Sequence, residues 1–159
     1  MPAPEITTLL KFLDQAFKGP AWHGPTLAES LRGVSADVAL RSPGPGRHTI
    51  WEYALHAAYW KCVARQRITG DLSIEFERSP SDWPATPAVI TEATWKADRA
   101  LLKREHDLFR AAVAKLSPRD LKKKGKSSRW TREAEIMGIA SHDLYHAGQI
   151  GLTKRLVGA

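Results

Sequence analysis

The sequence predicts an all-α protein that folds as a four-helix bundle, with a short extra helix between the first two long helices. Four long segments carry apolar residues at helical spacing, and Gly, Pro or capping residues bound them. Alternation typical of a strand is confined to one short piece, residues 72–76. A chain of 159 residues, 43% of them hydrophobic, suits a single core. We therefore expect one domain over residues 1–159.

The first long helix is predicted over residues 6–17, where apolar side chains recur every three or four positions. Gly19-Pro20 ends it, because neither residue favours a helix interior. A short helix is predicted over residues 26–31, with Thr26 as its N-cap. The breaker at residues 42–46, Ser-Pro-Gly-Pro-Gly, then separates it from the second long helix.

The second long helix is predicted from Thr49 to about Ile68, closed by Gly70. Three prolines make residues 71–87 a loop. The third long helix is predicted over residues 88–116 and stops at Ser117-Pro118.

The last long helix is predicted to begin at Thr131, a capping residue followed by an early Glu, and to run to about Val157. Long connections after the first and second long helices allow a topology other than up-down-up-down.

The net charge of +7 is concentrated in residues 103–132, which hold eleven Lys and Arg against three acidic residues. The favoured interpretation is a solvated loop over residues 122–132; the alternative is a surface for an acidic partner or nucleic acid. Nucleic acid is the weaker reading, because no binding motif or aromatic stacking platform accompanies the charges. No membrane span or signal peptide is predicted, and the lone Cys62 excludes an internal disulfide. We expect a cytoplasmic protein.

His142 and His146 stand four residues apart in the last helix, so their side chains share one face. Two imidazoles placed in this way can reach one divalent ion, and a third ligand would complete a site with an open position. Core histidines bonded to the protein are the competing interpretation, since a buried imidazole needs a partner.

The spacing is similar to the H-E-x-x-H zinc helix, with Asp143 in place of Glu. Residues 147–159 contain no His, Cys, Asp or Glu, so a peptidase-like third ligand downstream is absent from the sequence. The best upstream candidate is His56, on the apolar stripe of the second helix, although a core histidine fits that position equally well. His23, His48 and His106 are predicted to be structural or solvated, with His106 on a charge-rich helix surface.

Taken together, these motifs resemble the DinB-like (YfiT/DinB) family of metal-dependent enzymes. The resemblance rests on His56 in an aromatic helix, on the His-x-x-x-His-Ala-Gly-Gln-Ile run that begins at His142, and on three tryptophans and a glycine: Trp51, Trp60, Trp95 and Gly70. It implies an up-down-down-up bundle, commonly a homodimer, and a three-histidine site for Ni²⁺ or Zn²⁺. The ligands it implies are His56, His142 and His146.

The same resemblance implies a small-molecule substrate, including a low-molecular-weight thiol. The leading hypothesis is therefore a thiol-dependent S-transferase, because a metal held by neutral imidazoles can activate a thiol. A metal-hydroxide hydrolase is the alternative within the enzymes. A non-catalytic binding protein that uses the basic 122–132 loop is the alternative outside them.

Overall fold

The computed structural model describes residues 2–159, and within them the regular structure is helical throughout. This confirms the predicted all-α class. The helices are α1 (Pro4–Phe17), α2 (Leu27–Ser30), α3 (Ala36–Leu40), α4 (Ile50–Thr69), α5 (Glu92–Ala114), α6 (Pro118–Leu121) and α7 (Arg132–Leu156).

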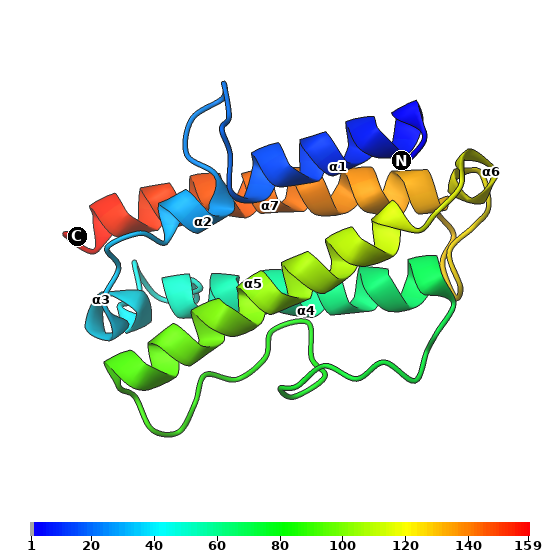
Figure 1. The fold of residues 1–159 in the computed structure, drawn as a ribbon. Coiled ribbons are helices and arrows are strands. Elements are labelled where there is room, and N and C mark those ends of the chain that lie inside the picture. Colours follow the sequence, from blue (N-terminus) through cyan, green and yellow to red (C-terminus); the bar gives the residue numbers. More distant parts are fainter. Residues whose placement is uncertain (1) are drawn as a thin grey trace.

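Four long helices, α1, α4, α5 and α7, form the body of the molecule (Figure 1). Helix α4 packs against α5 and α7, and α1 packs against the same two helices. In Figure 1, α4 and α5 run from the end that holds α3 toward the end that holds α6, whereas α1 and α7 run the other way. Because α4 and α5 point in the same direction, the chain between them has to return along the whole length of the bundle.

Several residues at the helix ends form capping hydrogen bonds that are typical of their residue types. Thr26 and Thr49 each accept a backbone N–H three residues on, and a glutamate at that position bonds back, which makes a capping box for α2 and for α4. Gly70 ends α4 in the left-handed conformation that glycine adopts without strain. Thr131 caps α7 at the predicted position.

Two short helices and one boundary differ from the sequence prediction. Helix α3 lies in a stretch predicted to be a connection, where Ser35 caps one turn. Helix α6 follows the predicted stop, because Ser117 accepts from the Asp120 N–H and starts a new turn. Helix α5 begins at Glu92 and not near residue 88, because Thr91 provides the cap.

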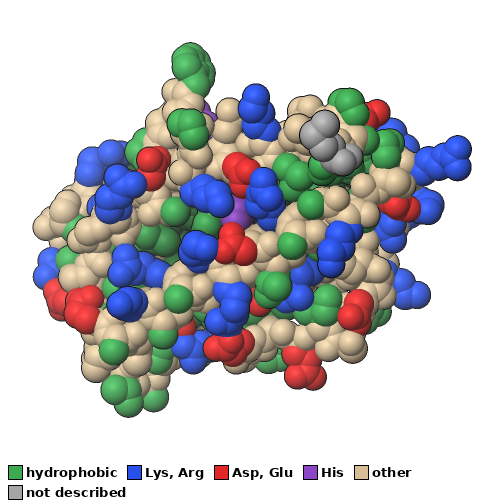
Figure 2. All heavy atoms as spheres, viewed as in Figure 1, with side chains coloured by type: hydrophobic (Ala, Val, Ile, Leu, Met, Phe, Trp, Pro, Cys, Tyr) green, Lys and Arg blue, Asp and Glu red, His purple; other side chains and the backbone are tan. Residues whose placement is uncertain are grey.

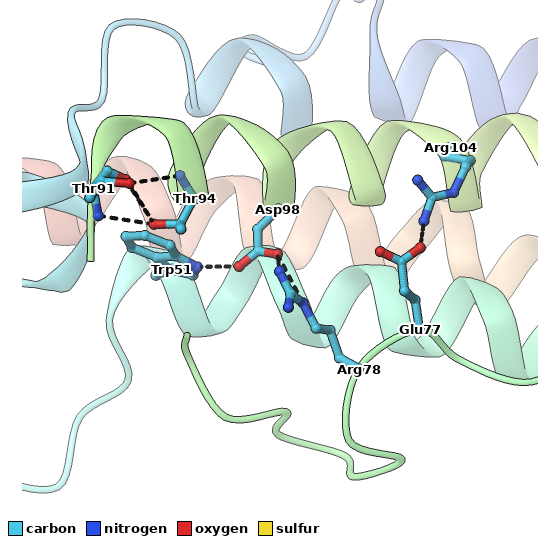
Figure 3. A network of polar contacts seen from close by, with 7 residues as sticks. All are labelled: Trp51, Glu77, Arg78, Thr91, Thr94, Asp98 and Arg104. Carbon is cyan, nitrogen blue, oxygen red and sulfur yellow. Dashed lines mark hydrogen bonds and ion pairs between the residues drawn. The ribbon is translucent and has the colours of Figure 1, made fainter. Parts of the chain in front are cut away.

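The connection between α4 and α5, residues 70–91, is irregular but firmly attached. Figure 3 shows Arg78 of this segment donating to Asp98 of α5, which also accepts a 2.8 Å hydrogen bond from Trp51 Nε1 of α4. Asp98 has no exposed surface, so its charge needs both donors. Glu77 pairs with Arg104 in the same figure. These contacts fix the course of the segment past α4.

The interior consists of two apolar clusters, one at each end of the bundle. The cluster nearer α3 contains Trp51 and Trp95, and the cluster nearer α6 contains Phe109 and Ile136. On the face in Figure 2, basic side chains are interspersed with acidic and hydrophobic ones. Among the described residues, no helix combines the length and the apolar character that crossing a membrane requires.

Candidate metal centre

Helices α4 and α7 bring three imidazole rings together midway along the bundle. His56 Nε2 lies 3.1 Å from His142 Nε2, and His146 Nε2 lies 2.9 Å from that same nitrogen. Taken as a set, one ligand atom from each residue lies within 4.8 Å of the others. The structure thus places the three predicted residues, which we call the histidine cluster, at a common point.

The outer ring nitrogens of the cluster are held by the protein. His56 Nδ1 contacts the Asp82 carbonyl, which can only accept, so this nitrogen carries the proton. His146 Nδ1 lies 2.6 Å from Gln149 Oε1, and with that amide orientation it also donates. Both Nε2 atoms therefore present lone pairs toward His142. The ring of His142 can donate to one of them and not to both.

This arrangement fits a divalent cation. Two nitrogens that each lie about 2.0–2.1 Å from a tetrahedral zinc ion are about 3.3 Å apart, close to the 3.1 Å and 2.9 Å that separate His142 Nε2 from the other two rings. A cation would accept the lone pairs that the rings cannot satisfy among themselves. Hydrogen bonds from the outer nitrogens to protein oxygens are the usual way in which metal-binding imidazoles are oriented.

The surroundings keep the three imidazoles neutral, which is the form that binds metal. Burial lowers the pKa of His142 to about 3, and His146 and His56 add to the shift because protonated rings so close together would repel one another. Burial likewise lowers the pKa of His146 to about 4, and it lowers the pKa of His56.

An aromatic wall supplied by the 70–91 connection covers His56. The Trp83 ring stacks on His56 with centroids 3.9 Å apart, and His48 stacks on Trp83 at 3.4 Å. Asp82, the neighbour of Trp83, accepts from Trp60 Nε1 at 2.6 Å while its carbonyl holds His56. No pattern in the sequence indicates these roles, because an irregular loop has no periodicity that reveals which side chains it contacts.

The cluster opens on one side into a cavity of about 500 Å³ between α4, α7 and the basic loop. His142 is the member of the cluster that lines it, and it is half-buried, whereas His56 and His146 are buried. The remaining lining residues are Trp60, Arg67, Trp130, Ala134, Glu135, Gly138 and Ile139. A molecule of modest size can therefore approach the cluster from this side.

An ion pair that the sequence analysis missed lies directly behind the cluster. Lys61 Nζ donates to both carboxylate oxygens of Asp143 at 2.6 Å, and both side chains are almost completely buried. Asp143 follows His142 in the chain but points into the core. Its carboxylate is occupied by the lysine, so it does not take the place of the catalytic glutamate of a zinc peptidase helix.

The other predicted histidines stay outside the cluster. His23 is exposed and His48 is half-buried on Trp83. The surface prediction for His106 is wrong: this ring has no exposed surface and stacks on Phe17 with centroids 3.9 Å apart. Leu102 and Phe109 lie on the same side of α5 as His106 and are buried. Their burial decides where the His106 ring points, although its neighbours in sequence are charged.

Three further residues of α4 and α7 lie near the cluster in sequence but are not part of it. Glu52 caps the α4 N-terminus and does not contact His56 through a hydrogen bond. Tyr145 is 64% exposed on the outer side of α7. Cys62 is buried, and burial raises the pKa of its thiol to about 11, which leaves it protonated and unreactive.

The geometry defines an all-helical protein with a candidate metal site formed by three histidines. A family model described as the DinB superfamily matches residues 22–150, and the chain belongs to this superfamily. The resemblance recognised in the sequence is thereby confirmed. Comparisons with curated proteins and with solved structures gave no match.

Proposed function

We propose that this protein is a metal-dependent enzyme in which His56, His142 and His146 hold one divalent ion, Ni²⁺ or Zn²⁺. The observation that supports the proposal is the convergence of the three Nε2 atoms, two of which have their outer nitrogens fixed by oxygen acceptors. When bound, such an ion lowers the pKa of a thiol or a water molecule at its open position.

The residues of the chain then have distinct tasks. Asp82 and Gln149 hold the rings of His56 and His146 in one tautomer, which keeps their Nε2 lone pairs directed at the site. Trp83 shields His56 from water by stacking on it. His142 borders the cavity, and the substrate reaches the site from its side.

The reaction we propose is thiol-dependent S-transfer. A thiol sulfur forms a bond to an electrophilic carbon of a second small molecule, the bond from that carbon to its leaving group breaks, and the thiol proton leaves with that group or passes to solvent. Neutral imidazoles leave the full charge of a dication available to stabilise a thiolate, which supports this chemistry.

Metal analysis joined to an activity assay tests the proposal. We expect about one equivalent of Ni²⁺ or Zn²⁺ in the purified chain and a loss of that metal in His56→Ala, His142→Ala and His146→Ala. His23→Ala, in an exposed turn, serves as the control and should keep the metal. Full metal content in all three cluster variants would refute the site.

Metal-hydroxide hydrolysis is the alternative reaction at the same site. It needs no thiol, so turnover of an aryl ester by the metal-loaded chain without added thiol would favour hydrolysis. Turnover of an aryl halide that requires added cysteine or glutathione would favour S-transfer.

A non-catalytic protein that binds an acidic partner through the 122–132 loop is the alternative from another class. Within the loop, Lys122 pairs with Glu133 and Lys123 with Asp120, which satisfies part of its charge. Salt-sensitive DNA binding that survives His142→Ala would favour this alternative.

For the whole protein we propose one domain over residues 1–159, an up-down-down-up four-helix bundle, a homodimer and a cytoplasmic location. The directions of the four long helices in Figure 1 and the contacts that join them support the bundle topology.

A further inference from the structure

Two arginine–tryptophan pairs flank the cavity beside the histidine cluster. The guanidinium carbon of Arg67 lies 5.6 Å from the Trp60 ring centroid, and that of Arg129 lies 4.7 Å from the Trp130 ring centroid. Trp60 comes from α4, whereas Trp130 ends the basic loop just before α7. Both tryptophans line the cavity, so two aromatic walls each carry a positive charge.

The lining between these walls is small and apolar. Gly138 lies one turn before His142, and a Cβ atom added to it would meet nothing within 4 Å. Ala134 and Ile139 complete this part of the lining. A flat apolar group can therefore lie against α7 between the tryptophans and reach His142.

Glu135 is the one acid among the lining residues, and the protein already compensates its charge. Ser128 Oγ donates to it, and Arg67 Nη1 lies 3.4 Å from both of its oxygens. This last distance is at the outer limit of a hydrogen bond, so the Arg67 guanidinium retains donors for a ligand. Arg129 is not itself a lining residue, but it is exposed and lies over the ring of Trp130, which is one, so it adds a positive charge beside the cavity.

We propose that the cavity selects an organic anion with a planar apolar body, for example an aromatic carboxylate, and that the basic loop contributes to this choice through Arg129 and Trp130. The body would lie between the two tryptophans, and the anionic group would interact with the arginines. This inference rests on the proposed function, since it names the substrate class of the same site.

Calorimetry on the Zn²⁺-loaded chain of 159 residues tests the proposal with 2-naphthoate, its neutral amide and acetate. Acetate shows what metal coordination alone contributes, because it has no aromatic body. We expect 2-naphthoate to bind at least about tenfold more tightly than either of the other probes. Equal affinity for 2-naphthoate and acetate would overturn the proposal.

Variants at exposed positions separate the cavity from the metal. Trp130 is 53% exposed, so Trp130→Ala should fold. We expect Trp130→Ala and Arg129→Gln each to weaken 2-naphthoate about fivefold to tenfold and to leave acetate unchanged. The matched controls Trp22→Ala and Arg32→Gln, both highly exposed and remote in sequence, should change neither. If Trp130→Ala and Arg129→Gln behave like these controls, the assignment is wrong.

Filling the cavity provides a second, steric test. Gly138→Leu should abolish 2-naphthoate binding, while Gly151→Leu on the same helix, also in open space, should preserve it. A chain that takes up no Zn²⁺ would refute the proposed function alone, and the same probes and variants on that metal-free chain would still decide the selectivity. Zn²⁺ uptake without the predicted variant effects would refute only the substrate class.

Discussion

The histidine cluster and the Lys61–Asp143 pair are neighbours on the same two helices, but they satisfy their polar atoms in opposite ways. In the ion pair, one ammonium meets both oxygens of one carboxylate, and both side chains are almost completely buried. In the cluster, three nitrogens face one another and the cavity borders His142. The ion pair is complete within the chain, whereas the cluster has room for a partner from outside. This difference separates a polar group that is satisfied within the protein from one that is open to a ligand.

Breaking the ion pair should have the largest effect. Asp143→Ala leaves the Lys61 ammonium buried without a counter-charge, and we expect a loss of about 3–5 kcal/mol in the free energy of unfolding. The double variant Lys61→Met, Asp143→Leu removes both charges and should lose much less. Urea denaturation at pH 7 measures both. A double variant as unstable as the single one would show that the pair matters for more than charge compensation.

Adding metal should distinguish the cluster from the ion pair. At a free Zn²⁺ concentration of about 100 times the Kd, the native chain should gain about 2.7 kcal/mol of stability. His56→Ala and His142→Ala should lose this gain, while the control His23→Ala should retain it. Thermal unfolding with and without Zn²⁺ provides the measurement. An unchanged gain in His142→Ala would mean that the ion binds elsewhere.

His106 offers a third kind of buried polar group, with neither a metal nor a hydrogen-bond partner among the described residues. Burial lowers its pKa to about 2, and Lys61 is the first of the positive neighbours that add to the shift. An unfolded histidine titrates near 6.5, so the unfolded chain binds the extra proton first, and stability falls as the pH drops from about 6.5 toward 2.

At pH 5 this single ring should lower the free energy of unfolding by about 2 kcal/mol relative to pH 7.5. His106→Leu should remove that part of the pH dependence, which urea denaturation at the two pH values can show. If His106→Leu loses as much stability between pH 7.5 and pH 5 as the native chain does, other groups cause the acid sensitivity.

The smallest expected effect concerns the open side of the cluster. Gly138→Ala places a methyl group in free space on a helix, and we expect a gain of about 0.5–1 kcal/mol in the free energy of unfolding. Chemical denaturation measures it, with metal content as the accompanying readout. A loss of stability would mean that this side of α7 is covered in solution.

The sequence predicted the parts of this molecule that depend on neighbouring residues. Thr131 caps α7 as expected, α4 begins next to its predicted start at Thr49, and the spacing of His142 and His146 placed both rings on one face. The resemblance to a family then identified His56 as their partner. Lys61 and Asp143 were not paired in advance, because 82 positions separate them and each is ambiguous alone.

The roles of the loop residues at the site could not be predicted from the sequence either. Asp82 and Trp83 act through their position in space, which depends on the attachment of Arg78 to Asp98. His106 was misplaced because charged residues adjoin it in the chain, whereas in the fold its ring is buried and stacks on Phe17. Local pattern thus predicted the helices, and tertiary contacts decided the rest.

The parallel course of α4 and α5 has an evolutionary implication. Two successive parallel helices need a long connection between them (Figure 1). Here that connection, residues 70–91, contacts His56 Nδ1 through the Asp82 carbonyl. Arg78 of this segment is tied to the buried Asp98, but Trp83 stacks on His56 from outside the helices, so an exchange at Trp83 would change the surroundings of that imidazole. The reactivity of the site can therefore change while the three rings themselves are kept.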